Sequence, residues 1–541
     1  MRPTIVQPVI VQPVIIQPVI VQPTIVQPSI EQPDRWGLPA EAVEQLGTTL
    51  YDFWTRYRGD FTTQTHDGSQ YAYAYLSAQL RMEADRNYAN IARKTGHSGQ
   101  NMQHFMSNSP WDVRRLYAHI AREIISTPGL QDGGVLIVDE SADARAGVVS
   151  AGAQKQYNGR LGKVDVSQVG VFVAYANARI DGGPFWTWAR GDLFLPEGWF
   201  SDEEPMLSTR HRVGIPPERE PQTKIEIAWQ LIQDTHQSGL TWEIICCDTL
   251  YGRSQWFRDQ VGKGGFVYMA EVPCDTQVYL HTPTLGIPPR TSSQGRTPTR
   301  FRVLSDEKPV EVRSLVSAPE TQWQRVRIRT IERGELRDGF AARRVWTVSD
   351  DHHEAVEAWL VMRKEGVGKY SYALCNAPAE TPLRQLAWWK CQRYFVERSN
   401  QDAKSELGWD EFQAQKYRAW QHEVAMTVLA SWFLAQTKLD LAHTYLRDPE
   451  LAHDFEVEVL PRLSTANIRE LLRAVLPLPQ LTPREATALV VEHLINRTRS
   501  RASRLRKAGT HTRLSHGSPV PQEAKPPPVE VEGSRIGRQK G

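Results

Sequence analysis

The sequence has few cysteines, no long apolar run and no excess of charge of one sign. Its 541 residues include five cysteines, an odd number, and no two of them have the C-x2-C spacing. This argues against a disulfide framework and a structural zinc site, and it favours a reducing cytoplasm. No apolar run approaches the roughly 18 residues that cross a membrane. The longest candidate, residues 425–435, is typical of a buried helix, so we expect no membrane contact.

Charge is nearly balanced, with 64 basic and 62 acidic residues and a net charge of +2. This excludes a uniformly basic protein but leaves room for local basic patches. Hydrophobic residues make up 40% of the chain, which is enough for large cores, and the length predicts roughly three to four domains.

The first segment, residues 1–33, repeats proline every five residues, mostly in a P-V-I-V-Q unit. Proline at this spacing blocks both a helix and a central strand. We interpret the segment as a disordered extension, or as translated repetitive DNA upstream of the true start.

The rest of the chain changes character several times, which predicts an α/β protein. Residues 34–130 are typical of helices, and 131–265 alternate between apolar strands and amphipathic helices. Residues 266–375 are rich in strand formers separated by proline and glycine. Helical patterns return over 376–445 and 446–508, and 509–541 form a tail rich in proline and glycine that we expect to be disordered.

Residues 87–106 predict two helices joined by a short turn that contains glycine. The second helix would expose Gln100, Asn101 and Gln103, together with His104. Amide side chains can recognise base edges in the major groove of DNA, as in a helix-turn-helix motif. A plain helical hairpin without DNA contacts explains the pattern equally well.

Two aspartates directly follow apolar runs, and we expect both runs to be buried strands. Asp139 follows residues 135–138, and Asp248 follows residues 244–247. If the strands are neighbours, the two carboxylates lie close together and raise each other's proton affinity, unless a cation separates them. Hard divalent cations prefer oxygen ligands, and Mg²⁺ above all suits a position between two such carboxylates. Taken singly, each aspartate also fits an ordinary cap or turn.

A third acid, Glu397, lies among cations at helical spacing. Arg393 and Lys404 are separated from Glu397 by four and seven residues, and Lys390 precedes Arg393 by three. On one continuous helix these side chains form a stripe that suits metal binding by the carboxylate and phosphate binding by the cations. An ordinary ion pair between Arg393 and Glu397 is the alternative.

A basic segment lies near the end of the chain. Residues 497–507 contain no acid and six cations, among them Arg499, Arg501 and Arg504. Such a segment fits a contact with the DNA backbone, and a solvated tail fits it as well.

Several blocks of the sequence resemble DDE transposases of bacterial insertion sequences, within the insertion-sequence-four superfamily and most of all its seven-hundred-and-one-type group. Arg393, Glu397 and Lys404 match the superfamily signature in spacing, although Lys390 occupies its tyrosine position. The Asp139-Glu140-Ser141 stretch, the Q-Y-N-G-R-L-G-K-V-D block at 156–165, the L-P-E-G-W block at 195–199 and Asp248 with Tyr251-Gly252 are similar as well. The resemblance covers about residues 38–507.

This resemblance implies a ribonuclease-H-like catalytic core formed by residues 131–265 and 376–445, with a β-rich insertion at 266–375. A helical DNA-binding region would precede the core, and a helical, basic region would follow it. Asp139, Asp248 and Glu397 would be catalytic and would hold two Mg²⁺ ions, with Mn²⁺ as an alternative. Lys390, Arg393 and Lys404 would bind DNA phosphates.

The implied partners are double-stranded DNA, as terminal inverted repeats and as target, and a second copy of the chain in a homodimer on paired ends. The implied location is the bacterial cytoplasm, at the nucleoid. The implied reaction is cut-and-paste transposition. A catalytically silent, transposase-derived DNA-binding regulator is the alternative function. A glycoside hydrolase with two carboxylates would suit the 17 tryptophans but leaves the Arg393–Glu397–Lys404 pattern unexplained.

Overall fold

A computed structural model describes residues 33–478, apart from residues 160, 181–182, 291–295, 332–333 and 458, together with scattered residues from 483 to 506. The repeat at 1–33, except for its last proline, and the tail at 509–541 lie outside the described residues. Residues up to Leu478 form one compact unit, and those from Pro479 onward form a second unit that is described by itself.

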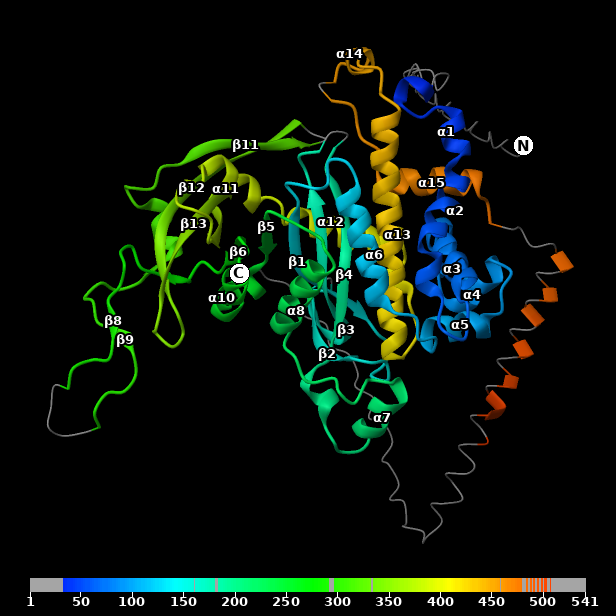
Figure 1. Ribbon diagram of the computed structural model, residues 1–541, viewed down its shortest axis with the longest axis horizontal. Helices are drawn as coiled ribbons and strands as arrows, with labels where there is room; N and C mark the ends of the chain where they lie inside the picture. Colours follow the sequence, from blue (N-terminus) through cyan, green and yellow to red (C-terminus); the bar gives the residue numbers. More distant parts are fainter. Residues whose placement is uncertain are drawn as a thin grey trace, which may run out of the picture. The chain divides into compact units, whose positions relative to one another are not determined.

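A mixed β-sheet forms the centre of the first unit (Figure 1). Its strands β1 (Val135–Ala144), β3 (Lys163–Asn177) and β4 (Phe185–Phe194) are antiparallel neighbours, and β2 (Gln154–Asn158) forms a hairpin with β3. On the other side of β1, β5 (Ile244–Cys247) and β6 (Tyr268–Val272) run parallel to it. The apolar runs at 135–138 and 244–247 are completely buried, as their composition predicts.

Four long antiparallel strands extend the same sheet beyond β6. They are β11 (Gln324–Ile331), β12 (Gly334–Val348), β13 (Ala355–Gly366) and β14 (Lys369–Cys375), and β14 pairs with β6. Four two-residue strands precede them: β7 (Gln277–Val278), β8 (Leu285–Gly286), β9 (Arg302–Val303) and β10 (Val310–Glu311). Residues 266–375 are therefore rich in strands, as expected, but β6 is a parallel strand of the central sheet.

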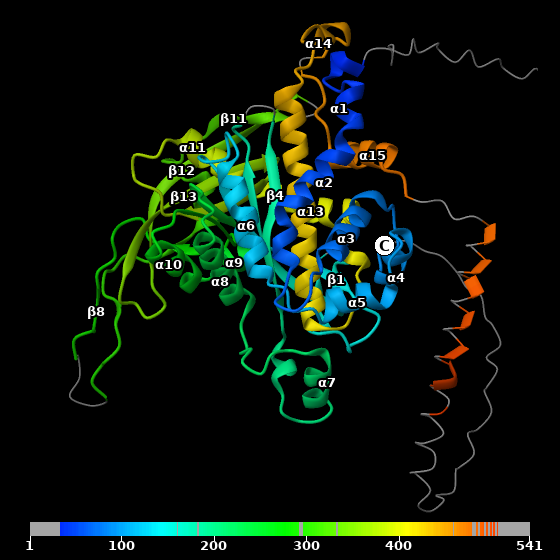
Figure 2. The same cartoon turned by 45° about the vertical axis from the view of Figure 1, so that its right-hand side comes forward.

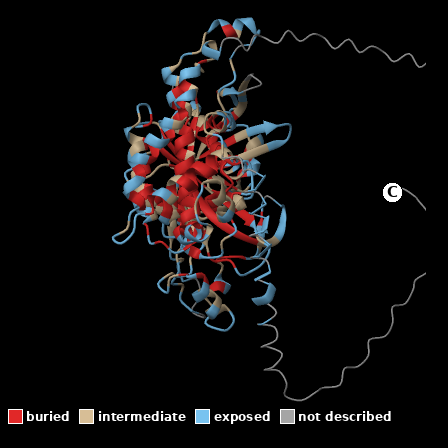
Figure 3. Cartoon of the chain, turned by 90° about the vertical axis from the view of Figure 1, so that its right-hand side faces the viewer, coloured by how far each residue is buried: buried red, intermediate tan, exposed pale blue. Residues whose placement is uncertain are grey.

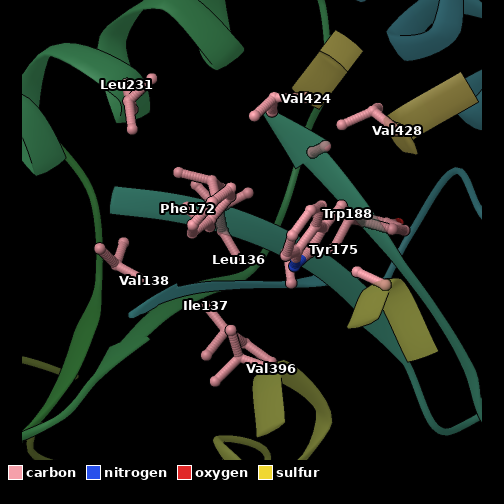
Figure 4. Close-up of a cluster of buried hydrophobic side chains, with 14 of the residues drawn as sticks. Leu136, Ile137, Val138, Phe172, Tyr175, Trp188, Leu231, Val396, Val424 and Val428 are labelled. Atoms are coloured by element: carbon pink, nitrogen blue, oxygen red, sulfur yellow. The ribbon is translucent and has the colours of Figure 1, made fainter. Parts of the chain in front are cut away.

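Helices cover the sheet from both sides. Helix α8 (Lys224–Gln237), which begins with a capping box between Thr223 and Glu226, packs on β3 and β4. Helix α12 (Tyr394–Gln401) packs on β1, β3 and β4. In the close-up, Ile137 of β1 points toward Val396 of α12, whereas Leu231 of α8 lies on the opposite side of the sheet (Figure 4). Because side chains alternate along a strand, Asp139 faces the same side as Ile137.

The long helix α13 (Tyr417–Thr444) lies between β4 and the helices that come first in the chain (Figures 1 and 2). These include α2 (Leu46–Tyr57), α3 (Ser69–Arg81) and α5 (Gly99–Ser107), whereas α6 (Val113–Ser126) packs on both α13 and β4. Residues are buried on nearly all sides of α13, as expected for a helix enclosed within a large core. Figure 3 shows this buried interior against an exposed periphery.

The remaining helices are short. They are α1 (Ala40–Glu44), α4 (Tyr88–Lys94), α7 (Met206–Val213), α9 (Thr249–Gly252), α10 (Gln255–Lys263), α11 (Leu383–Lys390), α14 (Glu450–Asp454) and α15 (Thr465–Val475). Within the described part of the chain, no helix has the length and apolar character needed to cross a membrane.

Candidate active site

Strand register brings three acids into one row across three parallel strands of the central sheet. Val138 of β1 is aligned with Cys247 of β5, and Cys247 is aligned with Ala270 of β6. The three strands are parallel, so the next residues, Asp139, Asp248 and Glu271, occupy adjacent positions. The expected neighbourhood of Asp139 and Asp248 is confirmed at the level of the backbone.

Asp139 does not end its strand, which corrects the expectation from the apolar run. Strand β1 continues to Ala144 and pairs with β3 over its whole length. The strand that ends here is β5, and Asp248 caps the helix that follows it by accepting hydrogen bonds from the backbone N–H groups of Leu250 (2.9 Å) and Tyr251 (3.5 Å). The continuation of β1 turns Glu140 toward α8, where it lies 3.4 Å from Lys224 Nζ.

Asp248 is close enough to Asp139 to influence its ionisation. Burial, followed by the charge of Asp248, raises the pKa of Asp139 to about 8. Burial, followed by the charge of Glu140, raises the pKa of Asp248. Arg393 lowers both pKa values but does not cancel the other effects. A cation bound between the two carboxylates would offset both effects, so the site favours cation binding.

Arg393 links this aspartate pair to Glu397. The guanidinium lies within electrostatic range of Asp139 and Asp248, and its Nη2 atom donates a 2.6 Å hydrogen bond to Glu397 Oε1. Its Nε atom is 3.5 Å from Glu271 Oε2. The Glu397 side chain is 53% exposed. No three Asp, Glu, His or Cys side chains in the described ranges converge to hold one metal ion. The shared metal site of all three predicted acids therefore stays a prediction.

The single helix expected over residues 390–404 is wrong. Helix α11 ends at Lys390, α12 spans Tyr394–Gln401, and one π-helical turn covers Asp402–Glu406. The Lys390 side chain is completely buried, with Nζ 3.3 Å from Glu271 Oε1. Lys404 donates a 3.0 Å hydrogen bond to the Ala142 carbonyl of β1. The π-turn changes the angular spacing that the prediction of one stripe assumed.

Glu271 is not among the predicted site residues. The pattern that identified Asp139 and Asp248, an apolar run followed by an acid, also occurs in the β6 stretch Tyr268-Met269-Ala270-Glu271. The sequence places this strand at the start of the β-rich region 266–375, apart from the two strands that lead to the aspartates. The parallel pairing of β5 with β6 supplies the missing relationship.

The predicted helix-turn-helix segment consists of α4 and α5, separated by residues 95–98. Gln100, Asn101 and Gln103 are exposed, as expected, and the Asn101 amide donates a 3.1 Å hydrogen bond to the Tyr71 hydroxyl. In the second unit, Arg499 and Arg501 are exposed, whereas Arg504 lies outside the described residues. The DNA contacts of all these residues stay predictions.

Comparison with known proteins identifies the family. Residues 57–335 match the family described as DDE superfamily endonuclease, a range that contains Asp139 and Asp248 but ends before Glu397. The probable transposase for insertion sequence element IS701 of Microchaete diplosiphon is 27% identical over 322 residues, which are 59% of this chain and 69% of that protein. These similarities favour the enzyme over the regulator that the sequence left open. Since the family match extends over more than half of the chain, the protein belongs to the DDE superfamily of endonucleases and is a DNA-cleaving transposase of the insertion-sequence type.

Proposed function

We propose that the protein excises an insertion sequence at its terminal inverted repeats and joins it to target DNA, using Asp139, Asp248 and Glu397 as ligands of two Mg²⁺ ions. The observation that carries this proposal is the adjacent pair of aspartates with raised pKa values, to which Arg393 connects Glu397. Two crowded carboxylates suit a hard divalent cation, because a bound cation offsets their repulsion.

The strand order supports a ribonuclease-H-like core. Three antiparallel strands, β4, β3 and β1, are followed by two strands parallel to β1, namely β5 and β6. We infer that β11–β14 are the insertion, which joins this core along β6.

Each predicted ligand has a separate task. Asp139 and Asp248 would hold the ions at the carboxyl edge of β5. Glu397 would turn from Arg393 toward the aspartate pair, which requires breaking its 2.6 Å ion pair. Divalent ions held there would activate a water or a 3′-hydroxyl of the DNA for attack and would stabilise the leaving oxygen of the phosphodiester. Arg393, once released from Glu397, would bind a phosphate next to the cleaved bond, where its planar guanidinium can donate two hydrogen bonds.

DNA recognition would involve surfaces away from this site. The exposed amides Gln100, Asn101 and Gln103 on α5 suit base edges of the terminal repeats. Arg499 and Arg501 suit the phosphate backbone. By its resemblance to the family, the protein would act as a homodimer on paired ends, which sedimentation of the complex with end DNA would measure.

The test is cleavage of duplexes that carry the ends of the element, with Mg²⁺ and with excess chelator. We expect Asp139→Asn to reduce strand cleavage by at least about a thousandfold while end binding stays within about twofold of wild type. Asp165→Asn is the matched control, because Asp165 is an acid of β3 whose side chain is 40% exposed and pairs with Lys163 (2.9 Å). Undiminished cleavage by Asp139→Asn, or by the wild type in chelator, would contradict the proposal.

A further inference from the structure

We propose that Glu271 is a positioning residue for DNA cleavage, which holds Arg393 between the aspartate pair and Glu397. The inference rests on the proposed function, since Arg393 matters for cleavage only if Asp139, Asp248 and Glu397 form the active site. Its starting point is the row of acids across β1, β5 and β6, in which Glu271 is the neighbour of Asp248.

The two carboxylate oxygens of Glu271 have different partners. Oε1 lies 3.3 Å from Lys390 Nζ, and Oε2 lies 3.5 Å from Arg393 Nε. Arg393 contacts Glu397 through its other end, at 2.6 Å. The result is a chain of alternating charges, Lys390–Glu271–Arg393–Glu397, that runs from the interior to the exposed carboxylate.

Lys390 fixes the inner end of this chain. Its side chain is fully buried, and Glu271 is the only carboxylate within ion-pair distance of its ammonium in the described part of the chain. Removing the partner of a buried charge is strongly destabilising, so the ion pair with Lys390 keeps Glu271 in place. Glu271 is itself on a strand paired on both sides, with β5 and β14, so its backbone has little freedom. Glu271 is therefore a rigid anchor for the Arg393 guanidinium, which is only 27% exposed.

The position of Arg393 matters because Asp139 and Asp248 also attract it. Without Glu271, the guanidinium would move toward these two carboxylates and occupy the space in which a cation binds. The attraction of Glu271 holds Arg393 to one side of the pair, where the guanidinium stays when Glu397 turns toward the aspartates. Glu271 thus acts on cleavage through Arg393 and needs no contact with DNA.

The experiment compares Glu271→Gln with wild type in cleavage of end DNA at saturating protein, and measures end-DNA affinity and melting temperature in parallel. We expect the cleavage rate to fall by about tenfold to a hundredfold, as for other misplaced groups in active sites, with affinity within about twofold of wild type. Glu243→Gln is the matched control, because Glu243 directly precedes β5 and accepts a 2.8 Å hydrogen bond from Trp389 of α11. A wild-type cleavage rate in Glu271→Gln would overturn the inference.

Two double variants separate positioning from simple loss of stability. Glu271→Gln/Lys390→Met removes the buried unpaired ammonium, and we expect it to recover melting temperature but not cleavage. In an Arg393→Lys background, Glu271→Gln should reduce cleavage by less than about twofold, because its effect passes through the guanidinium. Full recovery of cleavage in the first double variant, or an undiminished effect in the second, would overturn the inference.

Failure of the inference is distinguishable from failure of the proposed function. If Asp139→Asn abolishes cleavage and Glu271→Gln does not reduce it, the active site stands and only the role of Glu271 is refuted. If Asp139→Asn cleaves like wild type, the proposed active site fails, and the role of Glu271 fails with it.

Discussion

The buried carboxyl group of Glu423 should make the protein less stable at alkaline pH. Glu423 lies on α13 and is 2% exposed. It accepts hydrogen bonds from the Tyr75 hydroxyl and from Gln79 Nε2 (3.4 Å), both on α3. Burial raises its pKa from 4.5 to about 8, although the Tyr75 hydrogen bond and Arg145 act in the opposite direction. In the folded protein at neutral pH the group is therefore mostly protonated.

The sign of the effect follows from the raised pKa. The stabilising contribution is fully present below pH 4.5, where the carboxyl is protonated in both states, and is lost as the pH rises toward 8. At pH 7 the unfolded chain ionises this group and the folded protein does not, which lowers the free energy of unfolding by about 3 kcal/mol. Glutamine has the shape of the protonated side chain and does not ionise. We therefore expect Glu423→Gln to be more stable than wild type at pH 7–8 by up to this amount.

Urea denaturation followed by tryptophan fluorescence, at several pH values from 4.5 to 8, measures this difference. Glu44→Gln, on the exposed surface of α1, controls for the loss of one ionisable group. The neighbouring His422 acts on the acid side: burial lowers its pKa to about 3, so its contribution is lost below pH 6.5. His422 is present in both proteins, and the comparison of variant with wild type removes its effect. A stability difference that stays constant or shrinks between pH 5 and pH 8 would refute the reasoning.

Three further predictions concern function. Lys404→Ala should reduce cleavage by about tenfold or more with a change in melting temperature of no more than a few degrees; a collapse of the melting temperature would show that its hydrogen bond to Ala142 is structural. Replacing Arg499 and Arg501 together by alanine should reduce the slope of log affinity against log salt for end DNA by about 2, and an unchanged slope would exclude both from the backbone contact. Removal of residues 1–33 should leave excision unchanged in a donor-plasmid assay, so a strong loss would assign the repeat a function.

The sequence predicted the buried strands that lead to Asp139 and Asp248, because each of these strands follows from short-range rules. A wholly apolar run of four residues forms a buried strand, and an acid that follows it lies at the sheet edge. The extension of β1 to Ala144 was not predictable from this rule. Its second half, residues 139–144, is mostly polar in sequence and is held in the sheet by pairing with β3.

The failure of the predicted cationic stripe has a different cause. The stripe forms only if every residue from 390 to 404 has α-helical geometry. The turn before Tyr394 and the π-helical turn at 402–406 each violate it. Arg393 and Glu397 still meet, since only four residues separate them and the ion pair is local. Lys390 and Lys404, farther along the chain, contact other partners.

Glu271 illustrates what a sequence pattern leaves out. An apolar run followed by an acid is visible in β6, but its meaning depends on which strand lies beside β5, and pairing between strands is a tertiary property. Once the strand register is known, the positions of the charged side chains around Glu271 can be understood together. The row of three acids attracts a cation. The fully buried Lys390 pairs with Glu271, and Arg393 lies between Glu271 and the aspartate pair. A divalent ion at Asp139 and Asp248 would repel the guanidinium, which would weaken its attraction to the pair and strengthen its dependence on Glu271. Ion binding and the release of Glu397 from Arg393 are thus expected to be coupled, because both alter the same local balance of charge.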